Sequence, residues 1–208
     1  QRTISGVTEF DISSVKRQID DAIATSVGKE REIAFFGGSF TGIDRELMIS
    51  LLEIAHNYVI SGEVAGIRCS TRPDYINDEI LSILKSYKVK TVELGIQSVS
   101  PNVLLCTKRG HTVDDTVTAC RLVVEYGFEL VGQMMVGLPS STLDDEIATA
   151  KFIAQSGADY WIYGHSHRNI CATIGTTRRL SNQLGYIRIG EGRDFNPAAC
   201  IVTDTTAG

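Results

Sequence analysis

The sequence predicts an α/β protein: a parallel (βα) partial barrel of the TIM type, incomplete at its N-terminus, with a β-rich C-terminal tail. Up to about residue 156, short apolar segments alternate with amphipathic helical segments, which is typical of βαβ units. The apolar segments are hydrophobic on both faces in places, as in a buried parallel sheet. Neither G-x-G-x-x-G nor G-x-x-x-x-G-K occurs, which favours a barrel over a nucleotide-binding doubly wound sheet.

Each predicted element has a local cause. Apolar residues at helical spacing predict helices, and apolar runs closed by glycine or proline predict buried strands. Asp44, Asn77 and Ser141 or Thr142 are typical N-caps. The predicted helices are 12–27, the segments after Asp44 and Asn77, 112–126 and 141–155. The predicted strands are 33–36, 66–71, 91–96, 129–136 and 159–163, with one more expected upstream and short strands at 170–174, 186–189 and 199–202.

Composition narrows the function classes. The chain has 208 residues, 43% of them hydrophobic, which is enough to bury the core of one domain or of one domain and a small appendage. A formal net charge of −5 gives no electrostatic case for nucleic acid or an anionic membrane. No apolar run approaches the roughly 20 residues of a membrane helix. The 5 cysteines are widely spaced, so we predict a reducing, cytoplasmic location.

Polar residues and glycines gather where the predicted strands end. In parallel α/β folds, ligands bind at these carboxyl ends. A glycine pair there lets the polar head of a ligand approach the backbone closely, although a tight turn alone also explains it. The segments at strand ends are Gly37-Gly38-Ser39, Ser70-Thr71-Arg72, Gln97-Ser98 and Gln133 before Gly137-Leu138-Pro139.

Five segments, each at a predicted strand end or in the loop after it, occur in a recognisable order: 33–41, 70–76, 92–98, 108–111 and 133–139. This series resembles the radical S-adenosylmethionine (SAM) enzymes, and most of all the branch around the Elongator catalytic subunit and the oxygen-independent coproporphyrinogen oxidases. The resemblance covers residues 1–153. It implies a (βα) barrel that binds SAM and cleaves it reductively to a 5′-deoxyadenosyl radical.

The resemblance implies roles for single residues at the methionine end of the cofactor. Gly37 and Gly38 match the glycine motif that takes the amino group through the backbone. Arg109 matches the arginine that holds the carboxylate, a task that suits a planar bidentate donor. Taken alone, Arg109 also fits a surface ion pair.

At the nucleoside end, the resemblance implies that Gln97 and Gln133 contact the ribose. Ser70 stands where a further polar contact with the cofactor is expected. Taken singly, each glutamine also fits an amide in a barrel interior. The agreement of the whole set favours the cofactor interpretation.

The cluster motif of the family is absent from the sequence. A [4Fe-4S] cluster needs three thiolates on a C-x-x-x-C-x-x-C loop, which leaves one iron open for the cofactor. No C-x-x-C or C-x-x-x-C spacing occurs, and we interpret Cys69, Cys106 and Cys120 as core residues or scattered thiols. We expect the cluster segment upstream of Gln1, and we expect the chain as it stands to be inactive.

The C-terminal part has a different character. Residues 156–169 include His165 and His167, two imidazoles that can reach a metal ion from one loop. This stretch, with 181–186, resembles the calcineurin-like metallophosphoesterases and implies a divalent metal at His165 and His167. The other metal motifs of that family are missing, so these histidines also fit a solvent-facing pair.

Two units are therefore predicted: 1–155, a radical SAM-like partial barrel, and 156–208, a metallophosphoesterase-like segment. Three readings stay open: a radical SAM enzyme fragment, a metal-dependent phosphoesterase-like hydrolase, and a non-catalytic fusion of two gene fragments. RNA is a possible substrate through the family resemblance alone. The substrate and the oligomeric state do not follow from the sequence.

Overall fold

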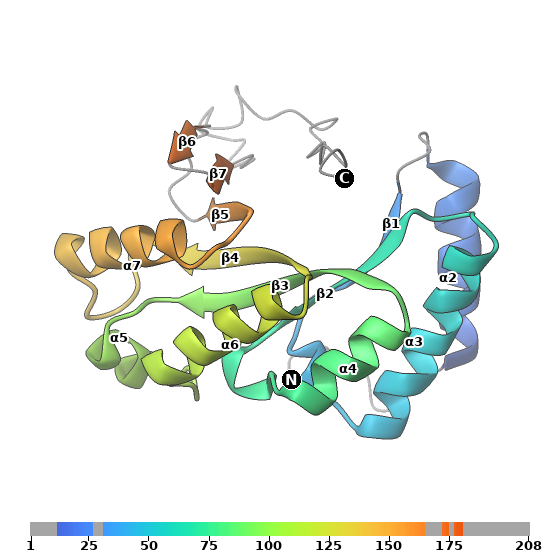
Figure 1. The fold of residues 1–208 in the computed structure, drawn as a ribbon, viewed down its shortest axis with the longest axis horizontal. Helices are drawn as coiled ribbons and strands as arrows, with labels where there is room; N and C mark the ends of the chain where they lie inside the picture. The colour runs from blue at the N-terminus through green and yellow to red at the C-terminus, as the bar shows by residue number, and fades with distance from the viewer. Residues whose placement is uncertain (1–11, 27–30, 165–171, 175–176, 181–208) are drawn as a thin grey trace, which may run out of the picture.

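The computed structural model describes residues 12–26, 31–164, 172–174 and 177–180 (Figure 1). Its α-helices are α2 (Ile12–Thr25), α3 (Arg45–Ile60), α4 (Asp78–Ser86), α5 (Pro101–Cys106), α6 (Val113–Glu125) and α7 (Leu143–Gln155). Its strands are β1 (Glu32–Phe35), β2 (Gly66–Thr71), β3 (Val89–Gln97), β4 (Glu129–Met135), β5 (Tyr160–Gly164), β6 (Ala172–Ile174) and β7 (Thr177–Leu180).

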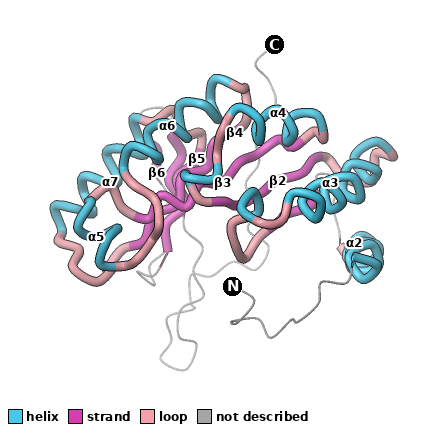
Figure 2. Tube along the Cα trace, turned by 90° about the horizontal axis from the view of Figure 1, so that it is seen from below, coloured by secondary structure: helices cyan, strands magenta, loops and turns pink. Residues whose placement is uncertain are grey.

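The strands form one sheet in the order β1-β2-β3-β4-β5-β7-β6, and β1 to β5 are parallel to their neighbours. Since each of β2 to β5 lies beside the strand before it, right-handed crossovers place the helices that connect them on the same face. Figure 2 shows this layer, with α3, α4, α6 and α7 over one side of the sheet. A doubly wound sheet would reverse its strand order, so the predicted partial barrel is confirmed.

The core lies between the sheet and this helical layer. Ile67, Val92, Leu94 and Leu130 point to the helices and are at most 1% exposed. Gly132 of β4 lets α7 approach closely, because a Cβ at this position would lie 2.9 Å from Ile153 Cγ2. Local pattern and packing agree on this face, as expected for helices laid over parallel strands.

The opposite face of the sheet is apolar only in places, as expected. Val131 is buried there beside Glu93, but Arg68, Glu93 and Gln133 share this face away from the helices. Glu93 is only 7% exposed, although it is a carboxylate in the middle of a strand. A buried charge persists where other polar groups partner it, so this face has a polar network in place of an apolar core.

The helix starts follow the predicted caps. Asp44 accepts a hydrogen bond from Leu47 N, and Asn77 accepts one from Ile80 N. Thr112 and Thr142 each begin a helix with a complete capping box. The sequence prediction missed α5, β7 and two short 3-10 helices at Phe40–Gly42 and Pro73–Tyr75, which are too short to show a hydrophobic period.

The sheet continues past the predicted boundary at residue 155. β5 pairs in parallel with β4, and the short β6 and β7 extend the same sheet. The strand predicted at 159–163 is thus confirmed, and that at 170–174 is confirmed in its second half. The strands predicted at 186–189 and 199–202 lie outside the described residues, and the division into two units stays a prediction.

Candidate functional site

All six predicted cofactor residues lie toward the carboxyl ends of neighbouring strands. Gly37 and Gly38 follow β1, Ser70 is the next-to-last residue of β2, and Gln97 ends β3. Gln133 lies near the end of β4, and Arg109 is in the loop between α5 and α6. The parallel register brings these positions to one edge of the sheet, with Ser70 beside Glu93 and Gly95 beside Gln133.

The loop after β1 is open at its glycine and anchored beyond it. Gly37 has a φ of +95° and no atom within 4 Å of where a Cβ would lie. The rings of Phe35 and Phe40 stack at 4.3 Å, and Thr41 Oγ1 lies 2.6 Å from Thr71 Oγ1 of β2. The loop therefore offers free space at Gly37 while its later residues are held against the next strand.

Gln97 has a backbone conformation that is unusual for glutamine. Its φ is +64°, and the register of β3 and β4 shifts between Gly95 and Gln97. Its amide Nε2 lies 2.8 Å from where a Cβ on Gly95 would be, so the side chain folds back over that glycine. Non-glycine residues at positive φ are uncommon and occur at functional sites when the surrounding structure enforces them. The fold brings the Gln97 amide beside the strand position that pairs with Gln133.

Gln133 belongs to a network across the polar face. Its Nε2 donates to Glu93 Oε2 at 2.7 Å, and Arg68 Nε lies 2.7 Å from Glu93 Oε1. Arg68 also reaches Glu32 Oε2 at 3.6 Å. The prediction missed Arg68 and Glu93 as site residues. The available signal was a charged residue within each of two apolar strands. The register pairs Arg68 with Thr91, which puts Arg68 diagonally opposite Glu93 on the same face.

Arg109 contributes a positive charge at this edge of the sheet. Its Nη2 lies 2.8 Å from Met135 Sδ at the end of β4, and its buried Nε has no hydrogen-bond partner among the described residues. Burial lowers the pKa of the Arg109 guanidinium, although arginine stays charged at neutral pH. A thioether is a weak acceptor, so the guanidinium keeps most of its capacity to bind an anion.

A second arginine supports this loop without being available to a ligand. The Arg72 guanidinium pairs with Asp74 and donates to Gly110 O at 3.4 Å. Gly110 has a φ of +81°, and a Cβ there would lie 2.9 Å from Arg72 Nη2. The neighbouring His111 is buried, and its Nε2 lies 3.2 Å from Ile96 O. Gly110 thus lets the Arg109 loop pack against the ends of β2 and β3.

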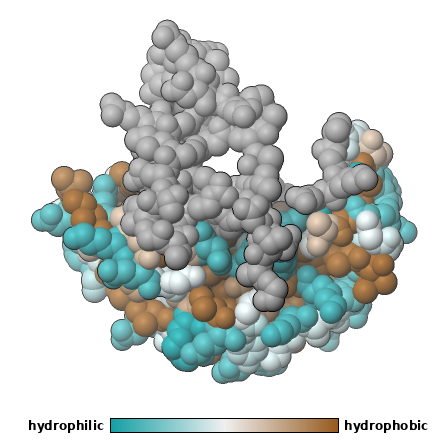
Figure 3. Space-filling view, turned by 45° about the horizontal axis from the view of Figure 1, so that its top comes forward, coloured by the Kyte–Doolittle hydropathy of each residue, from teal (hydrophilic) through white to brown (hydrophobic). Residues whose placement is uncertain are grey.

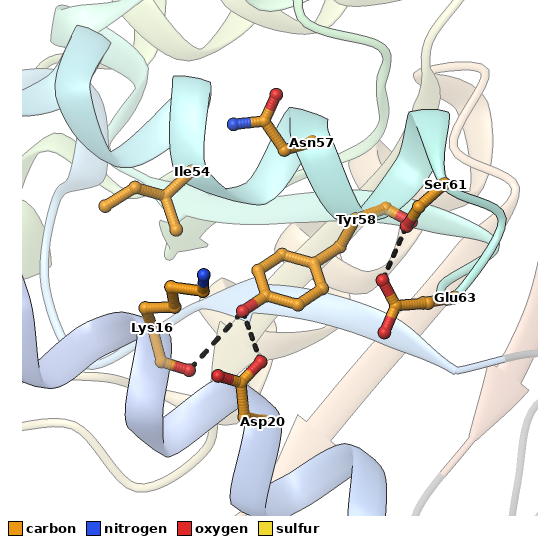
Figure 4. A pocket seen from close by; sticks show the side chains of 7 residues that line it. All are labelled: Lys16, Asp20, Ile54, Asn57, Tyr58, Ser61 and Glu63. Atoms are coloured by element: carbon orange, nitrogen blue, oxygen red, sulfur yellow. Dashed lines mark hydrogen bonds between the residues drawn. The ribbon is translucent and has the colours of Figure 1, made fainter.

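A hollow lies elsewhere, between α2 and α3 (Figure 4). It has a volume of about 420 Å³, and Tyr58 donates across it to Asp20 Oδ1 at 2.5 Å. Burial, together with Asp20, raises the pKa of Tyr58 to about 12. This contact joins α2 to α3, and none of the predicted cofactor residues lines the hollow.

Comparison with known families decides the assignment. A model of the radical SAM superfamily matches residues 2–153. This chain belongs to the radical SAM superfamily. The match contains all six predicted cofactor residues and ends shortly before the predicted boundary at residue 155.

Individual relatives point to the same branch. A tRNA uridine(34) acetyltransferase of Methanocaldococcus infernus is 34% identical to this chain over 87 residues. The alignment covers 39% of this chain and 16% of the relative. Human Elongator complex protein 3 is 39% identical over 82 residues, covering 39% of this chain and 15% of the relative. The chain therefore matches less than a fifth of the length of these two relatives.

Two solved structures share the fold. The structure of Methanocaldococcus infernus Elp3 with an N-terminal deletion aligns with a TM-score of 0.63 at 20% identity, over 79% of this chain and 43% of that one. Coproporphyrinogen III oxidase (HemN) from Escherichia coli, titled a radical SAM enzyme, aligns with a TM-score of 0.58 at 14% identity, over 90% and 40%. At these identities, the likeness concerns the partial barrel alone.

The described residues fit one family cofactor and not the other. The unpartnered Arg109 Nε and the open turn at Gly37 suit the charged methionine end of SAM. The described residues contain no group of three cysteines, histidines or carboxylates that could hold a metal. Burial raises the pKa of Cys69 and of Cys120 to about 12, which keeps both thiols neutral, and Cys106 is exposed on α5. A [4Fe-4S] cluster needs at least three cysteines that reach it together, and the described residues contain no such group, so they do not form a [4Fe-4S] site.

The metal prediction is not tested by the fold. His165 and His167 lie outside the described residues, and none of the matches reported above supports a phosphoesterase in residues 156–208. Both therefore stay predictions. No helix in the described part of the chain is long and apolar enough to cross a membrane, and the cytoplasmic location stays a prediction.

Proposed function

We propose that this chain is the SAM-binding part of a radical SAM enzyme of the Elongator type. The observation that carries the proposal is Arg109, a half-buried guanidinium with a weak thioether contact and an unpartnered Nε, at the strand edge that also holds Gln97 and Gln133. Taking a charged group out of water costs free energy unless an opposite charge meets it. The carboxylate of SAM would supply that charge.

Each residue in the proposed site has a distinct task. Arg109 holds the carboxylate of the methionine moiety, and the backbone at Gly37 and Gly38 receives the amino group. Gln97 and Gln133 bind the ribose from neighbouring strands, and Ser70 adds a polar contact. The positive φ of Gln97 supports this proposal, because it turns the amide onto the polar face of the sheet.

We further propose that the chain binds SAM without cleaving it. Reductive cleavage in this superfamily uses one electron from a [4Fe-4S] cluster, and the described residues do not fit that cluster. Binding alone needs the arginine, the amides and the glycine loop. The chain should therefore retain SAM but form no 5′-deoxyadenosine under reducing conditions.

For the whole protein we propose an RNA substrate, with tRNA as the first candidate. The support is one relative, a tRNA uridine(34) acetyltransferase, which matches 39% of this chain. The net charge of −5 does not favour RNA binding by this chain itself. The RNA contacts would accordingly lie in other parts of the complete protein.

The direct test is the binding of SAM to the purified chain by calorimetry. Replacing Arg109 by alanine removes charge-assisted hydrogen bonds worth roughly 1.5–3 kcal/mol, so the affinity should fall by roughly 10- to 100-fold. Arg121→Ala is the matched control, because Arg121 is exposed on α6 and pairs with Glu125. The control should bind like the wild type.

Two results would count against the proposal. One is a wild-type chain that does not bind SAM at millimolar concentration. The other is equal affinity in Arg109→Ala and Arg121→Ala, which would separate Arg109 from the ligand. The amount of 5′-deoxyadenosine formed with dithionite tests the second part, and clear turnover would show that a cluster assembles on this chain.

A further inference from the structure

The two oxygens of Glu93 have different partners. Oε1 lies 2.7 Å from Arg68 Nε, and Oε2 accepts a hydrogen bond from Gln133 Nε2 at 2.7 Å. Glu93 is 7% exposed, so both contacts lie largely out of water. Polar contacts in such a setting are electrostatically stronger than in water, and a carboxylate only accepts hydrogen bonds.

The contact determines which way the Gln133 amide is turned. A carboxylate cannot donate, so the group facing Glu93 must be the amide nitrogen. The register places Gly95 beside Gln133 and Glu93 two residues nearer the amino ends of the strands. One N–H of Gln133 thus points back along the sheet, and its carbonyl oxygen is left to face the strand ends.

We infer that Arg68 and Glu93 are positioning residues that fix Gln133 as a hydrogen-bond acceptor for a ligand hydroxyl. This inference rests on the proposed binding of SAM, whose ribose carries the hydroxyl groups. Neither residue needs to touch the ligand. Arg68 orients Glu93, Glu93 orients the amide, and the amide oxygen receives the hydroxyl proton.

The substitution Glu93→Gln should reverse the donor and acceptor roles in this network with almost no change in side-chain shape. Arg68 still needs an acceptor, so the new amide turns its oxygen to Arg68 and its NH₂ to position 133. Gln133 must then accept from residue 93 and present its own NH₂ to the ligand. We expect SAM affinity to fall by roughly two- to tenfold, which is the worth of one hydrogen bond.

A second substitution should undo the first. In the double variant Glu93→Gln with Gln133→Glu, residue 93 donates to the new carboxylate, whose other oxygen again faces the ligand as an acceptor. Affinity should return to within about twofold of the wild type. A purely structural role for Glu93 would not predict this rescue, because the double variant has a second change in the same network.

The ligand offers an independent readout. Glu93→Gln should cause no loss of affinity for one analogue of SAM, either the 2′-deoxy or the 3′-deoxy compound. That analogue is the one without the hydroxyl that donates to Gln133. Glu129→Gln is the matched control, since Glu129 lies in the same strand as Gln133 but accepts from Thr91 Oγ1 at 2.7 Å. That control should bind both analogues like the wild type.

A measurement without ligand separates the two proposals. In a ¹⁵N–¹H spectrum, the side-chain NH₂ signals of Gln133 are assigned by their loss in Gln133→Ala. One of these protons should be shifted downfield in the wild type by the carboxylate, and the shift should be absent in Glu93→Gln and unchanged in Glu129→Gln.

The outcomes are distinct. If the wild type does not bind SAM, the proposed function fails, while the spectrum still tests the orientation of the amide. The inference fails if the Gln133 signals are the same in the wild type and Glu93→Gln. It also fails if SAM binds and Glu93→Gln binds as tightly as the wild type, or if the double variant is weaker than either single one.

Discussion

The two faces of strands β2, β3 and β4 differ in what holds their side chains in place. On the helical face, Leu94 and Leu130 are fully buried against neighbouring apolar residues. On the other face, Arg68, Glu93 and Gln133 are joined by one ion pair and one hydrogen bond. The helical face is held by apolar packing, and we propose that the polar face orients Gln133 for a ligand.

This difference separates stability from binding. Burying apolar surface contributes free energy to folding without requiring a particular partner atom. Buried polar groups require defined partners, and they contribute specificity more than stability. Some apolar side chains stay exposed, among them Phe36, Leu105 and Leu143. Figure 3 shows hydrophobic residues in brown interspersed with hydrophilic ones in teal on the face that it draws. Changes on the two faces should therefore affect different measurements.

The largest effect is expected on the helical face. Leu94→Ala removes a side chain that is 0% exposed in the middle of β3, and it should lower the free energy of unfolding by about 2–5 kcal/mol. Urea denaturation measures this loss. Leu105→Ala is the control, since Leu105 is 78% exposed on α5 and its loss should stay within about 0.5 kcal/mol. Equal losses would mean that β3 does not lie in the main core.

An intermediate effect is expected on the polar face. Gly95→Ala places a Cβ 2.8 Å from Gln97 Nε2, so the amide must move away. If Gln97 binds the ribose, SAM affinity should fall by roughly two- to tenfold, the worth of one hydrogen bond, with little loss of stability.

The matched control is Gly66→Ala in β2, where the nearest atoms to an added Cβ are 3.5 Å away. Both variants add one methyl group to a strand glycine in the same sheet. Calorimetry with SAM compares them. A similar loss of affinity in the two variants would remove Gln97 from the binding site.

The smallest effect is expected at the helix starts, which belong to neither face. Hydrogen bonds from the side chain and the backbone of Thr112 hold the pKa of Asp115 below its usual value. Because the folded pKa is below the unfolded one, Asp115 stabilises the fold above about pH 4. This contribution is lost as the pH falls through the folded pKa.

The test compares the wild type with Asp115→Asn by thermal unfolding at pH 7 and pH 3. The difference in stability between them should shrink at the lower pH, because the wild-type carboxyl is then protonated. The exposed Asp114→Asn variant serves as the control. A difference that stays constant with pH would show that the charge of Asp115 does not strengthen this capping box.

The prediction from sequence succeeded where a local pattern has a single physical meaning. The apolar periods gave the strands and most helices, and Asp44 and Asn77 cap helices as expected. It missed α5, since a six-residue helix spans fewer than two turns and shows no period. It also placed Phe36 in a strand, although that residue follows β1 and is 74% exposed.

For the site, too, the sequence predicted what depends on local motifs and not what depends on contacts between strands. The order of motifs identified the residues at the strand ends, and family membership agrees with that order. The sequence did not show that Glu93 contacts both Arg68 and Gln133, because these residues are far apart in the chain and meet only through the register of β2, β3 and β4.

The sequence by itself determined which segments become helices and strands, because propensity, caps and hydrophobic period act within a few residues. It also determined the family, because the motifs occur in a fixed order. Only the tertiary structure decided which charges meet on the polar face and that Arg109 has a thioether neighbour and an unpartnered Nε. These contacts depend on distances between strands, and neither composition nor spacing specifies a distance across a sheet.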